Sequence, residues 1–167
     1  HLADPSLALS LVGGDETSLR EDLGYAGQLF ESLVVHDLRV YAAPIDGQVF
    51  HARDSAGREI DAIVQLPNGT WAAFEIKLGA RSETVESAAQ SLRRFASNVD
   101  GRTGPILTVV TGFGPSYRRA DGVNVVAIGS LGPSRASRPP KGARSRHLSG
   151  SLARGIRPWS RVCGDVV

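Results

Sequence analysis

Alternating hydrophobic and polar positions in two neighbouring segments, Glu59–Leu66 and Thr70–Leu78, predict two β-strands. The even-numbered positions of both segments are apolar, apart from Thr70, while the odd-numbered ones include all of their charged residues. Because strand side chains alternate between faces, a hairpin must pair even with even positions to keep one apolar face. A three-residue loop, 67–69, with its glycine in the left-handed conformation pairs Leu66 with Thr70 and gives this match. The pattern therefore predicts an antiparallel hairpin in that register.

The rest of the chain alternates between helical and β-rich patterns. A helix is predicted from about Asp22 to Tyr41, and a second from Glu83 to about Asn98. The apolar stripe expected on the first helix consists of Leu23, Ala26, Phe30, Leu33, Val34 and Tyr41. Further strands are predicted at Val49–Arg53, Pro105–Thr111 and Val123–Ile128. The order predicts an α/β fold with a mixed sheet: a helix, a three-strand antiparallel meander, a helix and two further strands, flanked by the helices.

Charge and composition divide the chain into three segments. We expect a helical lead-in at 1–20, a folded domain at 21–132 and a basic, disordered or extended tail at 133–167. The tail holds eight Arg or Lys residues against one Asp, whereas the first 132 residues hold 11 basic and 16 acidic residues. An acidic body argues against a broad phosphate-binding surface, so a nucleic-acid-binding tail and a solvated extension both stay open.

The remaining composition limits the class of protein. One cysteine allows no internal disulfide, and no apolar run approaches the length of a membrane span. We therefore expect a cytoplasmic protein without a membrane partner. The chain begins with His1 and contains no methionine, which favours a piece of a longer protein.

The hairpin register has a chemical consequence. It sets Ile60 opposite Ile76 and Asp61 opposite Glu75, with Lys77 on the same face as the two carboxylates. Two like charges at that distance are unfavourable unless a cation compensates them. Lys77 is one such cation, and Mg²⁺, which prefers hard oxygen ligands, is another.

Other ionisable residues are candidates for the same site as Asp61 and Glu75, or for different roles. Glu31 lies at the border of the apolar stripe of the first helix and is a third candidate ligand. Glu59 would lie opposite Lys77 and form a cross-strand ion pair with it. His36 and His51 each stand without a Cys or His at ligand spacing, which argues against zinc. An isolated Glu-x-Lys on a strand is more often an exposed ion pair than a catalytic site.

The ordered set of Glu31, Asp61 and Glu75-x-Lys77 resembles the PD-(D/E)xK nuclease superfamily. The segments R-E-I-D-A-I-V and A-F-E-I-K are similar to the signature of archaeal Holliday-junction resolvases. Roughly residues 1–132 also resemble an uncharacterised domain, domain of unknown function 4143, which usually follows an AAA-type ATPase module in prokaryotic proteins. The proline that names the superfamily is absent, since Ile60 precedes Asp61. No G-x-x-x-x-G-K-[ST] loop is present either, so ATP binding is not carried over to this chain.

The resemblance implies a restriction-endonuclease-like fold and a specific chemistry. Asp61 and Glu75, helped by the carbonyl of Ile76, would hold Mg²⁺ or Mn²⁺, and Glu31 would act through a water or on a second ion. Lys77 would position the attacking water or stabilise the transition state. The expected reaction is metal-dependent phosphodiester hydrolysis on DNA, with a homodimer among the assemblies that such relatives form. The alternatives are a catalytically silent module that binds nucleic acid or a protein for an ATPase, and a truncated remnant with neither role.

Overall fold

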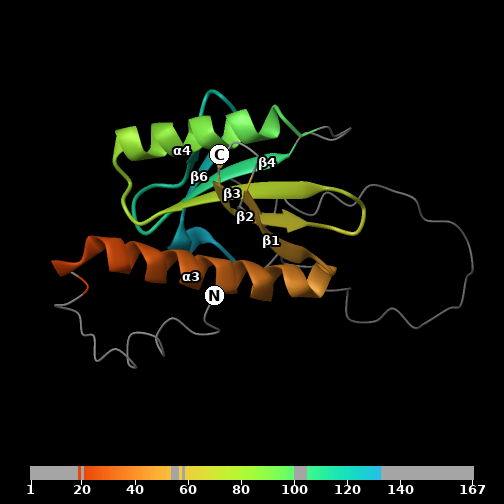
Figure 1. Cartoon of the computed structure of the whole chain (residues 1–167), viewed down its shortest axis with the longest axis horizontal. Helices are drawn as coiled ribbons and strands as arrows, with labels where there is room; N and C mark the ends of the chain where they lie inside the picture. The colour runs from red at the N-terminus through yellow and green to blue at the C-terminus, as the bar shows by residue number, and fades with distance from the viewer. Residues whose placement is uncertain (1–18, 20, 54–56, 58, 100–104, 133–167) are drawn as a thin grey trace, which may run out of the picture.

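The computed structural model describes residues 19, 21–53, 57, 59–99 and 105–132 (Figure 1). The expected helical lead-in and basic tail therefore lie almost entirely outside the described residues. Within the described ranges, no helix is both long and apolar enough to cross a membrane.

The described chain folds into a six-stranded mixed sheet between two helices, which confirms the predicted α/β class. The helices are α3 (Leu23–Ala42) and α4 (Ser82–Ala96), and the 3-10 turns are η1 (Ala43–Ile45) and η2 (Ile128–Ser130). The strands are β1 (Gln48–Arg53), β2 (Glu59–Gln65), β3 (Trp71–Lys77), β4 (Ile106–Thr111), β5 (Tyr117–Arg118) and β6 (Asn124–Ala127). Their order in the sheet is β1-β2-β3-β4-β6-β5, with β1 to β3 an antiparallel meander and β3, β4 and β6 parallel. The two-residue strand β5 was not predicted, because it is too short to show a periodic pattern.

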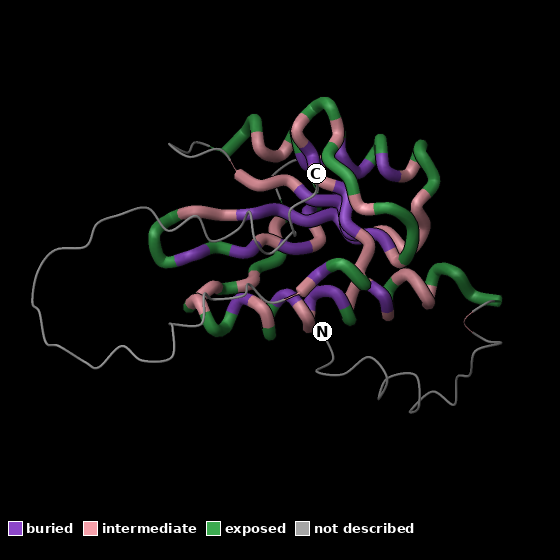
Figure 2. Tube along the Cα trace, turned by 180° about the vertical axis from the view of Figure 1, so that it is seen from behind, coloured by how far each residue is buried: buried purple, intermediate pink, exposed green. Residues whose placement is uncertain are grey.

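The helices cover opposite faces of the sheet, with α3 on one side and α4 on the other (Figure 1). Side chains of β2 and β3 at even positions, such as Val64 and Phe74, pack with α3. Odd positions of β3 and β4, such as Ala73 and Val109, pack with α4. Figure 2 shows that burial is concentrated along the central strands. The odd-numbered face is therefore not a free solvent face, and a group placed there is screened from water by α4.

The buried stripe of α3 is displaced from the predicted one. The buried residues are Phe30, Val34, Val35, Leu38 and Ala42. The prediction was wrong for Leu23 and Leu33, which are 69% and 37% exposed. At 3.6 residues per turn the observed stripe is rotated by about 90° from the predicted one. Packing on the sheet, and not the apolar residues of the helix alone, decides which side is buried.

The β2–β3 hairpin has the predicted register. Ala62 pairs with Phe74 and Gln65 with Trp71, and the Leu66 N–H donates to the Thr70 carbonyl at 2.8 Å. Gly69 has φ of +82°, the left-handed conformation that the three-residue loop requires. The parity argument therefore predicted this pairing correctly.

A β-bulge in β2 breaks the alternation next to Asp61. On the β1 side, Phe50 pairs with Ile63 and Ala52 with Ile60, so β2 uses one residue more than β1 over this stretch. An extra residue of this kind reverses the alternation of faces between the residues before it and those after it. Ile60 consequently packs on the α4 side, whereas Ile76 packs on the α3 side. The predicted opposition of Ile60 and Ile76 was wrong for this reason.

Candidate active site

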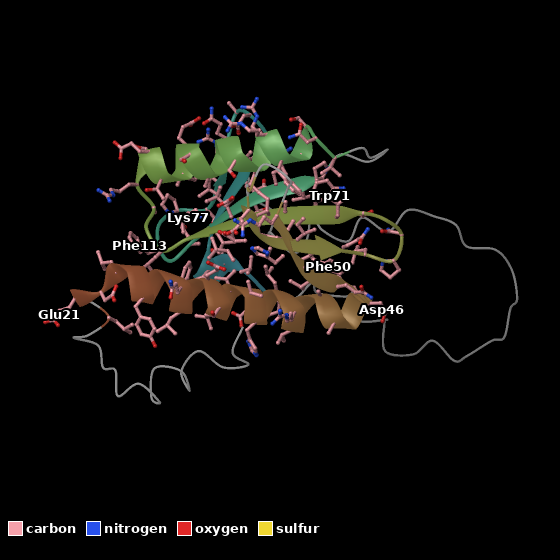
Figure 3. All side chains as sticks on the ribbon, viewed as in Figure 1. Glu21, Asp46, Phe50, Trp71, Lys77 and Phe113 are labelled. Atoms are coloured by element: carbon pink, nitrogen blue, oxygen red, sulfur yellow. The ribbon has the colours of Figure 1, made fainter. Side chains whose placement is uncertain are left out.

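Glu75 and Lys77 form a largely buried ion pair on the central strand β3. Strand alternation places both side chains on one face, and Lys77 Nζ lies 2.7 Å from Glu75 Oε2. Glu75 is only 5% exposed, while the side chain of Lys77 is about one third exposed. Figure 3 shows Lys77 at the same end of the sheet as Phe113, opposite the end that carries Trp71.

Asp61 reaches this pair from the bulge in β2. Its Oδ2 accepts a hydrogen bond from the Ile76 N–H at 2.7 Å and another from Lys77 Nζ at 3.1 Å. A side-chain oxygen thus contacts a backbone donor of β3 just beyond the last paired residues, Ala62 and Phe74. Since the N–H and C=O of a strand residue point to the same side, the Ile76 carbonyl is directed toward β2 as well. The bulge therefore brings a carboxylate and a main-chain oxygen into one region.

Helix α4 contributes a contact that the sequence did not reveal. The Ser91 hydroxyl donates to Glu75 Oε1 at 3.0 Å, so the Glu75 carboxylate is bonded on both oxygens. The only sequence signal was a small polar residue beside the buried Ala88, Ala89 and Leu92 of the same helix. That signal is equally consistent with a solvated position, which is why the contact was missed.

Glu31 extends the cluster from the α3 side. It lies one and two turns before the buried Val35 and Leu38 and is half-buried, in agreement with its predicted place at the border of the stripe. Burial raises its pKa, and the negative charge of Asp61 raises it further, whereas Lys77 and then His51 oppose the shift. The structure thus brings Glu31 into electrostatic range of Asp61.

The cluster holds more negative than positive charge. Burial, and then the charge of Asp61, raise the pKa of Glu75 against the opposing bonds from Lys77 and Ser91. Burial alone would lower the pKa of Lys77, but its hydrogen bond to Glu75 and the attraction of Asp61 outweigh burial and raise it. One lysine therefore faces three carboxylates, counting Glu31. An additional cation would be favourable here.

The donor set fits a hard cation held by few protein ligands. Across the described residues, no group of three His, Cys, Asp or Glu side chains is placed to hold a metal ion together. Glu31 therefore does not complete a three-carboxylate site with Asp61 and Glu75. Mg²⁺ is commonly held by one or two carboxylates together with waters and phosphate oxygens, which Asp61, Glu75 and the Ile76 carbonyl match in chemistry.

Glu59 and His36, both named from the sequence, lie outside the central contacts. Glu59 forms its ion pair with Arg53 at 3.2 Å, so its predicted pairing with Lys77 was wrong. The cause is the bulge, beyond which Glu59 pairs in register with Arg53 on β1. Asp37 contacts the neighbouring His36 at 3.3 Å.

Ser91→Ala is expected to raise the pKa of Glu75 further, because the hydroxyl stabilises the charged carboxylate. Ser87→Ala, about one turn earlier on α4, is the matched control and should leave that pKa unchanged. NMR titration of the Glu75 carboxyl carbon measures the difference. Equal titration curves for the two variants would contradict the expectation.

The raised pKa of Glu75 also makes the stability of the fold depend on pH. The folded protein binds the Glu75 proton more tightly than the unfolded chain, so stability falls as the pH rises from the ordinary value of 4.5 through the folded pKa. In Ser91→Ala this fall should extend to higher pH, as thermal unfolding over a pH series would show.

The fold and the cluster define a mixed α/β domain with a buried carboxylate–lysine group on its central strand. The chain belongs to the family described as a domain of unknown function (DUF4143), whose family model matches residues 26–131. Comparison with curated proteins and with solved structures finds no match.

Proposed function

We propose that this domain is a metal-dependent nuclease of the PD-(D/E)xK type that hydrolyses phosphodiester bonds in DNA. One observation carries the proposal: Asp61, at a bulge in β2, and Glu75, on β3, both contact Lys77. Each of these side chains occupies the motif position that the superfamily resemblance assigns to it. Glu31 approaches the same group from α3.

The carboxylates would hold Mg²⁺ or Mn²⁺, with the Ile76 carbonyl as a third oxygen donor and Glu31 acting through a water. Such an ion, when bound, lowers the pKa of a bound water and neutralises phosphate charge. Burial, and then the negative charge of Asp61, raise the pKa of Glu75, and a cation bound here would favour its charged form.

Lys77 would stabilise the negative charge that develops on the phosphate. Its raised pKa keeps the ammonium protonated at neutral pH, so it acts as a hydrogen-bond donor and not as a base. Its position between Asp61 and Glu75 would hold the ammonium next to any phosphate bound at these carboxylates.

A second candidate function is a non-catalytic accessory domain that binds nucleic acid or a protein on behalf of an ATPase module. The observation that favours it is that Lys77 bonds both carboxylates, so each of them has a cationic partner without a ligand. A structural ion-pair network has the same appearance.

Cleavage assays separate the two candidates. Labelled single-stranded, duplex and branched DNA, together with RNA, would be incubated with the protein in Mg²⁺, Mn²⁺ or EDTA. We expect metal-dependent cutting that Asp61→Asn and Glu75→Gln abolish. Glu83→Gln, an exposed acid in the first turn of α4, is the matched control and should cut like the parent protein.

Two results would count against the nuclease. The first is a folded parent protein that cuts none of these substrates, which would favour the accessory domain. The second is cutting that survives EDTA and both substitutions, which would point to a contaminating activity.

A further inference from the structure

Helix α4 carries a polar stripe beside its buried one. The buried stripe, Val85, Ala88, Ala89 and Leu92, packs on the sheet. Residues Ser87, Gln90, Ser91 and Arg94 follow the same i, i+3, i+4, i+7 spacing, so they share an adjacent side of the helix.

This polar stripe lines a cavity of about 160 Å³ between α4 and the start of β2. Glu59 and Ile60 of β2 and Phe95 of α4 form the rest of its lining. Ile60 reaches the α4 side only because of the bulge, so the irregularity that places Asp61 also shapes this cavity. Ser91 joins the cavity to the candidate active site, since its hydroxyl donates to Glu75.

Arg94 is the available positive charge of the cavity. Among the described residues its guanidinium has no ion pair or hydrogen bond, whereas the neighbouring Arg93 lies 3.7 Å from Asp121. The acid in the lining, Glu59, is already paired with Arg53. The cavity therefore offers a guanidinium, an amide and the Ser87 hydroxyl, with its acid compensated, whereas the Ser91 O–H is donated to Glu75.

We propose that this cavity is a subsite for the backbone phosphate of the nucleotide next to the cleaved bond. Arginine, serine and glutamine side chains are typical contacts of nucleic-acid phosphates. The planar guanidinium of arginine can donate two parallel hydrogen bonds to two phosphate oxygens. Ile60 and Phe95 provide an apolar wall for the attached sugar. The inference rests on the proposed nuclease function, because the phosphate subsite would fix the position of the nucleic-acid strand relative to Glu75.

The test compares Arg94→Ala with Arg93→Ala, which removes the same side chain one position away on the helix. Binding of a labelled oligonucleotide would be measured in EDTA, where no cleavage is expected, over a series of salt concentrations. We expect Arg94→Ala to weaken binding about tenfold. It should also reduce the slope of log affinity against log salt by about 0.7–0.9, the value for one phosphate contact. Arg93→Ala should change neither quantity.

Cleavage kinetics in Mg²⁺ complete the test, with Arg94→Ala expected to raise KM and to leave kcat within about twofold. Equal binding and equal salt slopes for the two arginine variants would overturn the subsite and leave the nuclease proposal standing. A parent protein that cuts nothing, but whose salt slope falls only in Arg94→Ala, would retain the phosphate site and reject the nuclease. A parent protein that binds no oligonucleotide would overturn the subsite.

Discussion

Lys77→Ala is expected to lower the rate of metal-dependent DNA cleavage by at least about 10²-fold, the effect of removing one preorganised donor from a developing negative charge. Lys77 is the cation that bonds both Asp61 and Glu75, so no other contact described here replaces it. Single-turnover cleavage at saturating protein measures the effect separately from binding. Arg118→Ala removes an exposed cation from β5, the strand at the far edge of the sheet, and serves as the control.

This variant also needs a check on folding. Without Lys77, Glu75 stays buried with Ser91 as its hydrogen-bond donor, and its pKa should rise further. Lys77→Met keeps the aliphatic part of the side chain and should lose cleavage equally while packing better. Full cleavage by either folded variant would make Lys77 a structural residue and would favour the accessory domain.

Phe74→Ala is expected to reduce the free energy of unfolding by about 3–5 kcal/mol, the usual cost of removing a core phenylalanine. Phe74 is 1% exposed, lies opposite Ala62 on β2 and packs in the cluster that joins the sheet to α3. The neighbouring Ala62 is small and α3 is packed on the sheet, so neither can readily fill the space that the Phe74 ring leaves. Urea unfolding monitored by circular dichroism measures the loss.

Phe113→Ala provides the comparison for this effect. Phe113 is 64% exposed, and its truncation should change stability by no more than about 0.5 kcal/mol. A loss below about 1.5 kcal/mol in Phe74→Ala would mean that α3 does not pack tightly on the sheet. The electrostatic coupling of Glu31 to Asp61 would then lose its structural basis.

The hairpin could be predicted from the sequence because the residues that determine its register all lie within the hairpin. Parity of apolar positions and a glycine in the loop determine the β2–β3 register without reference to other elements. The bulge depends on how β1 pairs with β2, and no pattern within β2 alone reveals it. The proximity of Asp61 to Glu75 was therefore foreseen, but the bonds of Asp61 to Ile76 and Lys77 were not.

The helices were predicted less completely for a related reason. Apolar residues on the outer side of α3, such as Leu33, weighted the expected stripe away from the observed one. Glu31, predicted at the border of the stripe, is half-buried one turn before the buried Val35. The bond from Ser91 to Glu75 joins a helix residue to a strand residue 16 positions away in the sequence, and only tertiary packing brings the two together.

On α4 the buried stripe holds the residues that stabilise the fold, and the polar stripe holds those proposed to contact nucleic acid. Substitutions at Ser87, Gln90 and Arg94 touch no buried position of the helix, so relatives could exchange these residues at little cost to folding. Under the proposed function, such exchanges would change the contacts to nucleic acid and leave the packed positions of the helix unchanged. Ser91 is the exception, because it belongs to the polar stripe and also holds Glu75. A change at Ser91 would alter recognition and chemistry together.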